Sequence, residues 1–307
     1  MTCASDRREE RGAESTWTTR RLLAWLTGHF ESKGVDSPRV AAEMLLAHVF
    51  GCERMRLYME IDRPASPLER ASLRELAARA ANHEPVQYLV GQAWFFGRPF
   101  EVNRSVFIPR PCTETLLEHV LQWRRATPGH AQGAIADIGT GSGCIAVSLA
   151  AQLSDAQIVA TDISQEALEL AKTNAQRHSV EDQIEFRLGP GLEPLTLRPG
   201  SGQFDVICSN PPYIPDHQWA EVAPNVRQYE PASALRGGGD GLDVIRPLIR
   251  GAGELLHPGG QLVVEIADCQ RDAALELAGA SQMLANPVVL KDHEGYWRVL
   301  VAQRPGS

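Results

Sequence analysis

The residues with the clearest potential for chemistry are Asn210-Pro211-Pro212-Tyr213, which follow the apolar run 204–209. Two consecutive prolines cannot continue a sheet ladder, because they lack N–H donors and their rings fix φ. The strand expected over 204–209 therefore ends at Asn210. The side-chain oxygen of Asn210 and the carbonyl of Pro211 are then left without a helix or sheet partner. Two oxygen acceptors beside an aromatic ring suit a planar group that carries an NH2, although a simple Pro-rich turn would leave the same pattern.

A glycine-rich turn is the second chemical feature. The apolar run 134–138 contains Asp137 and leads into glycines at 139, 141 and 143. The dinucleotide fingerprint G-x-G-x-x-G is not met, because its third glycine position holds Cys144. Glycine lets the backbone turn tightly and approach a ligand without a Cβ in the way. The start of the helix expected next offers free N–H groups to a carboxylate.

An acidic residue closes the second expected strand, since Asp162 ends the apolar run 158–162, 25 residues after Asp137. A carboxylate at the end of that strand is well placed to accept hydrogen bonds from both hydroxyls of a ribose. The glycine-rich turn, the acid before it and Asp162 together predict a site for a nucleoside-containing cofactor. The alternative is that the glycines only serve a tight turn.

The elements that must position these residues begin near residue 134, where apolar strands alternate with amphipathic helices. This pattern predicts an α/β fold with a doubly wound, mostly parallel sheet covered by helices on both faces. Strands are expected at 134–138, 157–162, 183–188, 204–209, 260–266 and 296–302, and helices at 143–152, 164–178, 241–256 and 269–280. Glu265 lies near a strand end, where we interpret it as a carboxylate with a structural hydrogen bond.

The first hundred residues read as helices, with Leu22, Leu26 and Phe30 on one stripe and Ser37-Pro38 and Ser66-Pro67 as start signals. Three or four short helices predict a small bundle over 16–92 that docks a partner. Residues 1–15 are expected to be a disordered tail, 93–109 a β-hairpin linker, and 110–307 the catalytic domain, with a helix starting near Thr113.

The composition fits a soluble cytoplasmic protein. The N-terminus lacks the apolar core of a signal peptide, and the most apolar helical stretch, 144–153, is too short to span a bilayer. Six scattered cysteines and nine dispersed histidines show no zinc-ligand spacing, so no metal site is expected. Residues 111–307 carry 14 Lys/Arg against 24 Asp/Glu, which weighs against a nucleic-acid substrate.

The motif set resembles the class I S-adenosylmethionine-dependent methyltransferases. The residues that carry the resemblance are Asp137-Ile138-Gly139-Thr140-Gly141-Ser142-Gly143, Asp162 and Asn210-Pro211-Pro212-Tyr213, and the last motif marks the subset that methylates planar amino groups. From about residue 17 to the end, the chain is similar to the release-factor glutamine methyltransferases (PrmC/HemK type). That likeness is carried by the stretches 84–91, 107–111, 209–215, 229–231 and 238–242.

The resemblance implies a Rossmann-like, seven-stranded sheet, S-adenosylmethionine as cofactor, and peptide chain release factors as protein partners of a monomer. The methyl acceptor would be the glutamine of a Gly-Gly-Gln loop, giving N5-methylglutamine. It implies Asn210, Pro211 and Tyr213 as catalytic residues. The implied cofactor-binding residues are Asp137, Gly139, Thr140, Gly141, Ser142, Gly143, Asp162 and Asn210. The implied substrate-binding residues are Asn210, Pro211, Pro212, Tyr213, Arg110 and Glu114.

Three alternatives and two departures from the family pattern stand beside this interpretation. The alternatives are a ribosomal-protein glutamine methyltransferase, an adenine-N6 DNA methyltransferase, and a binding module without activity. Cys112 occupies a position where the family usually has an acid. Gly189-Pro190-Gly191 stands where the family commonly carries Gly-Asp-Trp beside the adenine, and the sequence leaves open whether Leu192 and Glu193 replace it.

Overall fold

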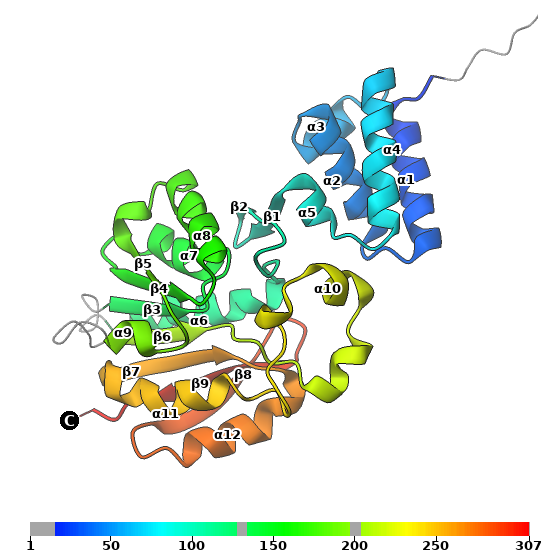
Figure 1. Ribbon diagram of the computed structural model, residues 1–307. Coiled ribbons are helices and arrows are strands. Elements are labelled where there is room, and N and C mark those ends of the chain that lie inside the picture. The colour runs from blue at the N-terminus through cyan, green and yellow to red at the C-terminus, as the bar shows by residue number, and fades with distance from the viewer. Residues whose placement is uncertain (1–15, 128–133, 197–203, 307) are drawn as a thin grey trace, which may run out of the picture. The chain divides into compact units, whose positions relative to one another are not determined.

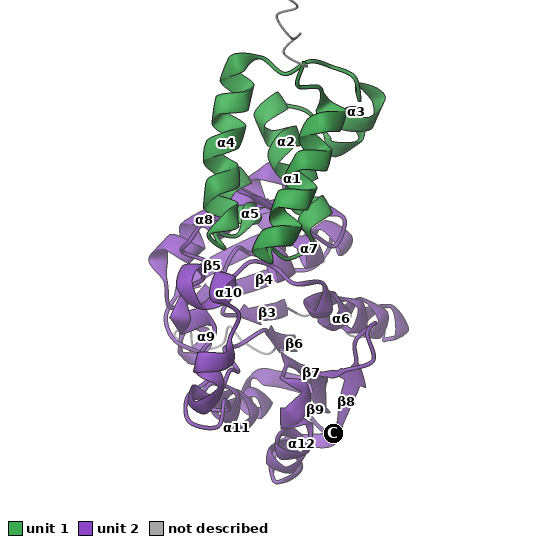
Figure 2. Cartoon of the chain, turned by 90° about the vertical axis from the view of Figure 1, so that its right-hand side faces the viewer, with its two compact units in different colours: residues 1–90 green, residues 91–307 purple. Residues whose placement is uncertain are grey.

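A computed structural model describes residues 16–127, 134–196 and 204–306 of the chain. It separates into two compact units, residues 1–90 and 91–307 (Figure 2). The tail expected over residues 1–15 lies outside the described residues.

Helices make up the described part of the first unit. They are α1 (Thr19–Lys33), α2 (Pro38–Phe50), α3 (Arg54–Met59), α4 (Pro67–Ala81) and α5 (Val86–Val90). The start of α4 follows the sequence signal directly, because the Ser66 hydroxyl accepts from the backbone N–H of Glu69 while the Glu69 carboxylate accepts from that of Ser66. The apolar stripe of α1 is buried in this unit's own core. With the short helices α3 and α5, the described part of this unit has five helices, more than the expected three or four.

The second unit begins with an antiparallel hairpin, β1 (Gln92–Phe95) and β2 (Arg98–Glu101). A seven-stranded sheet follows in the order β5-β4-β3-β6-β7-β9-β8 (Figure 1). Its strands are β3 (Ala134–Ile138), β4 (Ile158–Asp162), β5 (Ile184–Leu188), β6 (Phe204–Ser209), β7 (Leu256–Glu265), β8 (Ala285–Lys291) and β9 (Trp297–Gln303). Strands β3 to β7 pair in parallel, and β9 runs antiparallel to both β7 and β8. The expected α/β, mostly parallel, seven-stranded fold is confirmed.

Both faces of the central strands β3, β4 and β6 are buried, as their continuous apolar runs require. Neighbouring residues alternate between two cores, so that Val206 faces the helices α6 (Glu114–Ala126) and α7 (Cys144–Gln152), while Ile207 faces α11 (Ile245–Leu255) and α12 (Arg271–Gly279). The other helices of this unit are α8 (Gln165–Arg177), α9 (Glu193–Thr196) and α10 (Pro224–Tyr229). Figure 1 shows the sheet between the two layers of helices.

Strand β8 is the strand that the sequence pattern does not locate. It lies at the edge of the sheet, only one of its seven residues is buried, and Pro287 interrupts its apolar run. Proline is tolerated at a sheet edge because that side needs no N–H donor. The pairing of β8 with β9 shifts register between Ala285 and Val288, next to this proline.

No group of three or more His, Cys, Asp or Glu side chains in the described ranges gathers closely enough to hold a metal ion. Within those same ranges, every helix is too short or too polar to cross a membrane.

Candidate functional site

The sheet register brings the predicted site residues to one edge. Ile138 at the end of β3 pairs with Thr161 of β4 on one side and with Ser209 of β6 on the other. The residues that follow these three positions, Gly139, Asp162 and Asn210, therefore emerge next to one another at the carboxyl ends of three adjacent strands. Ligands bind at this edge in open α/β sheets.

The glycine-rich turn leaves free space where side chains would otherwise stand. Gly139, Gly141 and Gly143 have φ values of 71°, 55° and 79°, in the left-handed region that other residues rarely adopt. Apart from the glycine and its two chain neighbours, no heavy atom of the described residues lies within 4 Å of the position that a Cβ would take at Gly139 or Gly141. The backbone conformation and the empty space at Gly139 and Gly141 would allow a ligand to lie directly against the turn.

The buried side chain of Asp137 fixes the conformation of this turn through hydrogen bonds. Its fully buried carboxylate accepts hydrogen bonds from the Thr140 hydroxyl at 2.7 Å and from the backbone N–H of Ala146 at 3.2 Å, both through Oδ2. Oδ1 has no hydrogen-bond partner among the described residues. Burial raises the pKa of Asp137 to about 7, against the lowering effect of these two bonds. We assign Asp137 to shaping the loop that would receive the cofactor.

The raised pKa of Asp137 predicts a pH-dependent stability. The carboxyl has an ordinary pKa of 3.8 and a folded-state pKa of about 7, so its neutral form favours the folded state and this stability is lost as pH rises through about 7. We expect the ligand-free protein to lose on the order of 2–4 kcal/mol of unfolding free energy between about pH 4 and pH 8 from this group. Asp137→Asn, which stays neutral, should flatten that slope in urea titrations. An unchanged slope would contradict the assignment.

Asp162 lies beside the turn with both carboxylate oxygens at its rim. Oδ2 accepts from the backbone N–H of Gly141 and Oδ1 from that of Ser164, each at 2.9 Å. The next residue, Ile163, is 69% exposed, and Leu188, which pairs with Asp162 across β4 and β5, is 53% exposed. A carboxylate flanked by two exposed apolar side chains suits a ribose joined to a flat base.

The stretch after β5, where the family pattern is missing, adjoins Asp162 through its backbone, since the N–H of Gly189 donates to the Asp162 carbonyl at 2.9 Å. Leu192 packs against the core on the α11 side, and its Cδ1 lies 2.8 Å from the Cβ position of Gly251. Glu193 is exposed at the start of α9. The exposed apolar side chains nearest Asp162 in the chain and across the sheet are Ile163 and Leu188, and the exposed Pro190 follows Leu188.

Asn174 is a buried residue of the site region that sequence analysis missed. Its Oδ1 accepts from the backbone N–H of Glu101 at 2.7 Å, and its Nδ2 donates to the carbonyls of Glu101 at 3.0 Å and Ser142 at 2.8 Å. It thereby ties the hairpin to the glycine-rich turn. A lone amide on the apolar face of the helix expected over 164–178 is the signal that could have found it.

Asn210 is held in one orientation at the end of β6. Its Nδ2 donates to Oγ1 of Thr113 at 3.1 Å, and Thr113 comes from the segment just before α6. No donor among the described residues bonds to Oδ1 of Asn210 or to the carbonyl of Pro211. Two oxygen acceptors are thus left at the edge that also holds the glycine-rich turn.

Tyr213 is tied into the protein rather than standing free. Its hydroxyl donates to Oε1 of Glu265 at 3.3 Å, and its ring packs against the core on the α11 side. Burial and the neighbouring Glu265 raise the pKa of Tyr213 well above its usual range. The hydroxyl therefore stays protonated and acts as a donor.

The backbone after Tyr213 is clamped by Gly241 and Gln270. Nε2 of Gln270 donates to the Tyr213 carbonyl at 2.9 Å. A Cβ at Gly241 would lie 2.3 Å from that carbonyl oxygen and 2.4 Å from Nε2, at a φ of 81°. The clamp therefore has no room for a side chain.

Gly241→Ala should consequently displace the segment 210–213 and not merely strain its own loop. We expect a loss of about 1–3 kcal/mol in stability and a fall in kcat of at least about tenfold, since small misplacements at a reacting centre are costly. Steady-state kinetics and urea unfolding measure both. Gly295→Ala, at a φ of 91° and with no atom within 4 Å of its Cβ position, is the control matched for backbone strain. Equal behaviour of the two variants would contradict the clamp.

Arg110 and Glu114, the remaining predicted site residues, are not paired with each other. Arg110 forms an ion pair with the buried Glu230, which also accepts from the backbone N–H of Ile108 at 3.1 Å. Glu114 accepts from the backbone N–H of Phe96 at 2.7 Å, in the turn of the hairpin. Each side chain therefore fixes a neighbouring segment.

Comparisons with known proteins match both units of the chain. Residues 21–91 match the PrmC N-terminal domain, and residues 111–240 match the methyltransferase small domain. A release factor glutamine methyltransferase of Geobacter sulfurreducens is 45% identical over 259 residues, covering 84% of this chain and 87% of that protein. One of Rhodopirellula baltica is 38% identical over 299 residues, covering 96% and 99%.

Among solved structures, the hMettl16 catalytic domain in complex with the MAT2A 3'UTR hairpin 6 has a TM-score of 0.51 at 16% identity, covering 76% of this chain and 92% of that one. This likeness concerns the fold alone. The extent and identity of the sequence matches place the chain in the release factor glutamine methyltransferase family.

Proposed function

We propose that the chain transfers a methyl group from S-adenosylmethionine to the side-chain nitrogen of a glutamine in a peptide chain release factor, giving N5-methylglutamine. One observation carries this assignment. The N–H side of the Asn210 amide is engaged by Thr113, while Oδ1 and the Pro211 carbonyl accept no hydrogen bond from the described residues. Two free acceptors at the ligand edge suit the NH2 of a carboxamide.

The residues at the edge fit the cofactor. The open side of Gly139 and Gly141 would leave room for its methionine part, Asp162 would accept from its ribose, and Ile163 and Leu188 would lie against its adenine. Asp137, Thr140, Ser142 and Gly143 shape the turn, and Asn210 lies next to it. S-adenosylmethionine, when bound, supplies an electrophilic methyl group on a positively charged sulfur.

Asn210 and Pro211 act on the substrate amide. A carboxamide nitrogen is a poor nucleophile because its lone pair is delocalised into the carbonyl. When Oδ1 of Asn210 and the Pro211 carbonyl each accept one N–H, the nitrogen is oriented to attack the methyl carbon in line with the carbon–sulfur bond that breaks. Nitrogen becomes more positive as it reacts, so both hydrogen bonds strengthen in the transition state. Pro212 and Tyr213 line the approach of the amide.

No general base is required in this scheme. The Tyr213 hydroxyl is already a donor to Glu265, and its raised pKa keeps it protonated. After methyl transfer the nitrogen is far more acidic, and it loses one proton to solvent water. Positioning by two fixed acceptors therefore supplies the catalysis.

The parts of the chain divide this work. Residues 16–92 dock the release factor, 93–109 link the halves, and 110–307 methylate the glutamine of its Gly-Gly-Gln loop, with Arg110 and Glu114 bracing the approach. The protein acts as a cytoplasmic monomer without contacting nucleic acid. The excess of 24 Asp/Glu over 14 Lys/Arg in residues 111–307 disfavours a DNA substrate.

Transfer of labelled methyl groups tests the assignment. We expect label on a purified release factor and none on its Gly-Gly-Gln→Gly-Gly-Ala variant. Ribosomal proteins and DNA, offered in parallel, should stay unlabelled. Equal labelling of both release factors, or of DNA alone, would overturn the glutamine assignment.

A further inference from the structure

Asn174 is a fully buried amide on α8, and the proposed chemistry does not use it. Its Nδ2 donates to two backbone carbonyls, that of Glu101 at 3.0 Å and that of Ser142 at 2.8 Å. Its Oδ1 accepts from the backbone N–H of Glu101 at 2.7 Å. With the amide turned over, its oxygen would face the two carbonyls and its NH2 would face an N–H. Only one orientation of the side chain therefore satisfies all three backbone groups.

The bonds to Glu101 cap the outer edge of the hairpin. In the part of the chain that the structure describes, β1 is the only strand paired with β2. His178, one turn after Asn174 on α8, caps the same edge at Pro99, where its Nε2 lies 2.9 Å from the carbonyl oxygen. Because a carbonyl can only accept, this ring nitrogen is the donor. Two side chains of α8 at positions i and i+4 thus take the place of a neighbouring strand.

The hairpin that these side chains cap is itself firmly anchored. At its turn, the backbone N–H of Phe96 donates to the Glu114 carboxylate at 2.7 Å. The side chains of Phe95 and Phe100 are buried in the core on the side of α6 and α7. The hairpin is therefore a fixed support for whatever is bonded to its outer edge.

The third bond of Asn174 carries this support to the glycine-rich turn. The carbonyl that it binds belongs to Ser142, which is 1% exposed and lies between two of the turn's glycines. The turn rests directly on α8, because a Cβ at Gly143 would lie 3.0 Å from the Cβ of Ala171. A buried carbonyl that lost its donor would be left without a partner, which is costly enough to make the turn rearrange.

We propose that Asn174 is a positioning residue for the cofactor, since its bond to the Ser142 carbonyl keeps the glycine-rich turn in the conformation that receives S-adenosylmethionine. Asn174 does not touch the cofactor itself. It acts on cofactor binding and not on the methyl transfer step, because Asn210 is held by Thr113 instead. This inference rests on the proposed function for the ligand of the turn.

Alanine variants of Asn174 and His178 form a matched pair. Asn174→Ala removes the bonds to the hairpin and to the turn, whereas His178→Ala removes a bond to the hairpin alone. We expect the Kd for S-adenosylmethionine to rise on the order of 10–50-fold in Asn174→Ala and less than about twofold in His178→Ala. At saturating cofactor, kcat should stay within about threefold of the wild type in both.

Asn174→Asp separates the two bonded segments further. It keeps the size of the side chain and an acceptor for the Glu101 N–H, but it loses both N–H donors. Its Kd for S-adenosylmethionine should rise as that of Asn174→Ala does. Calorimetric titration, steady-state kinetics and urea unfolding of all four proteins measure affinity, kcat and stability.

Hydrogen exchange of the wild type tests the same link without any substitution, and it decides the question if the Asn174 variants do not fold. Coupling between two sites is reciprocal, so a cofactor that orders the turn should also order the hairpin through Asn174. We expect saturating S-adenosylmethionine to slow exchange of the Glu101 amide about fivefold or more. Unchanged exchange at Glu101 would overturn the link.

The variants give three further results that would overturn the positioning role while the proposed function stands. These are an unchanged Kd in Asn174→Ala, an equal rise of Kd in Asn174→Ala and His178→Ala, and a loss of kcat at saturating cofactor as large as the loss of affinity. A wild type that binds S-adenosylmethionine but methylates no release factor would overturn the proposed function alone. A wild type that binds no S-adenosylmethionine would overturn both.

Discussion

Asn210→Ala is expected to lower kcat about 10²–10³-fold, the loss typical of removing one preorganised hydrogen-bond partner of a reacting group. Oδ1 of Asn210 is one of only two acceptors assigned to the substrate amide, and its bond strengthens as the nitrogen becomes positive. Cofactor affinity should change little, because the glycine-rich turn and Asp162 do not depend on this side chain. Single-turnover kinetics and calorimetry separate the two quantities.

Asn210→Asp is the control for this variant. It keeps an acceptor oxygen at the edge but loses the N–H that donates to Thr113. We expect its activity to lie between those of the wild type and Asn210→Ala. Near-normal turnover in Asn210→Ala would refute the role of this residue in holding the amide.

The largest loss of stability is expected from breaking the ion pair that joins α6 to β6. Nη1 of Arg124 lies 2.8 Å from Oδ2 of Asp205, and both side chains are only 3% exposed. Asp205→Ala leaves a buried guanidinium without its carboxylate, which should cost about 3–5 kcal/mol of unfolding free energy. Urea unfolding measures the change.

A surface pair in the same unit provides the control. Arg271 and Asp272 also lie 2.8 Å apart, but their side chains are 39% and 88% exposed. Asp272→Ala should cost less than about 1 kcal/mol. Similar losses of unfolding free energy in Asp205→Ala and Asp272→Ala would contradict the expectation that the buried Arg124–Asp205 pair contributes more than the exposed pair.

The sequence predicts those features of the fold that depend on short stretches of the chain. Apolar runs mark the central strands, and their parallel order brings Gly139, Asp162 and Asn210 to one edge. The prolines after Asn210 predict the end of β6 and a free carbonyl. These features were predictable because each depends on a few neighbouring residues and on one rule about the ends of parallel strands.

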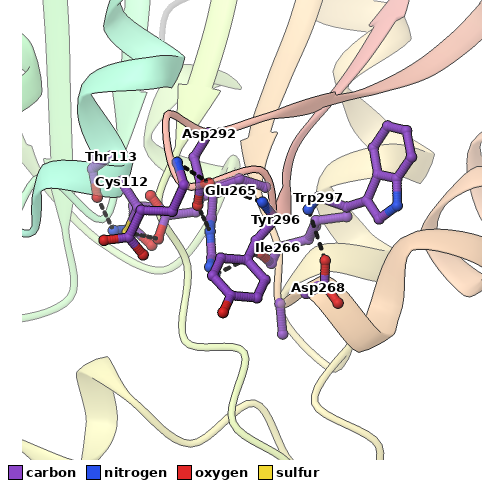
Figure 3. Close-up of polar contacts among 12 residues, drawn as sticks. Cys112, Thr113, Glu265, Ile266, Asp268, Asp292, Tyr296 and Trp297 are labelled. Carbon is purple, nitrogen blue, oxygen red and sulfur yellow. Dashed lines mark hydrogen bonds and ion pairs between the residues drawn. The ribbon is translucent and has the colours of Figure 1, made fainter.

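The supporting contacts were not predictable in the same way. Thr113 lies 97 residues before Asn210, and Glu265 lies 52 residues after Tyr213, so neither partner could be assigned before the packing was known. Glu265 has the structural hydrogen bonds expected of it, and the structure adds that they come from Tyr213 and Cys112. Figure 3 shows Cys112 beside Glu265. The edge strand β8 was not predicted, because Pro287 interrupts its apolar pattern. The roles of the individual site residues stay predictions.

Methylation of a glutamine side chain is tested most directly by peptide mapping of a release factor after reaction with the enzyme and S-adenosylmethionine. Mass spectrometry should find one added methyl group on the glutamine of the Gly-Gly-Gln loop, recovered as N5-methylglutamine after complete digestion. The same peptide treated with Asn210→Ala should remain unmodified over the same time. A methyl group on another residue of the release factor, or an unmodified loop after reaction with the wild type, would contradict the proposed function.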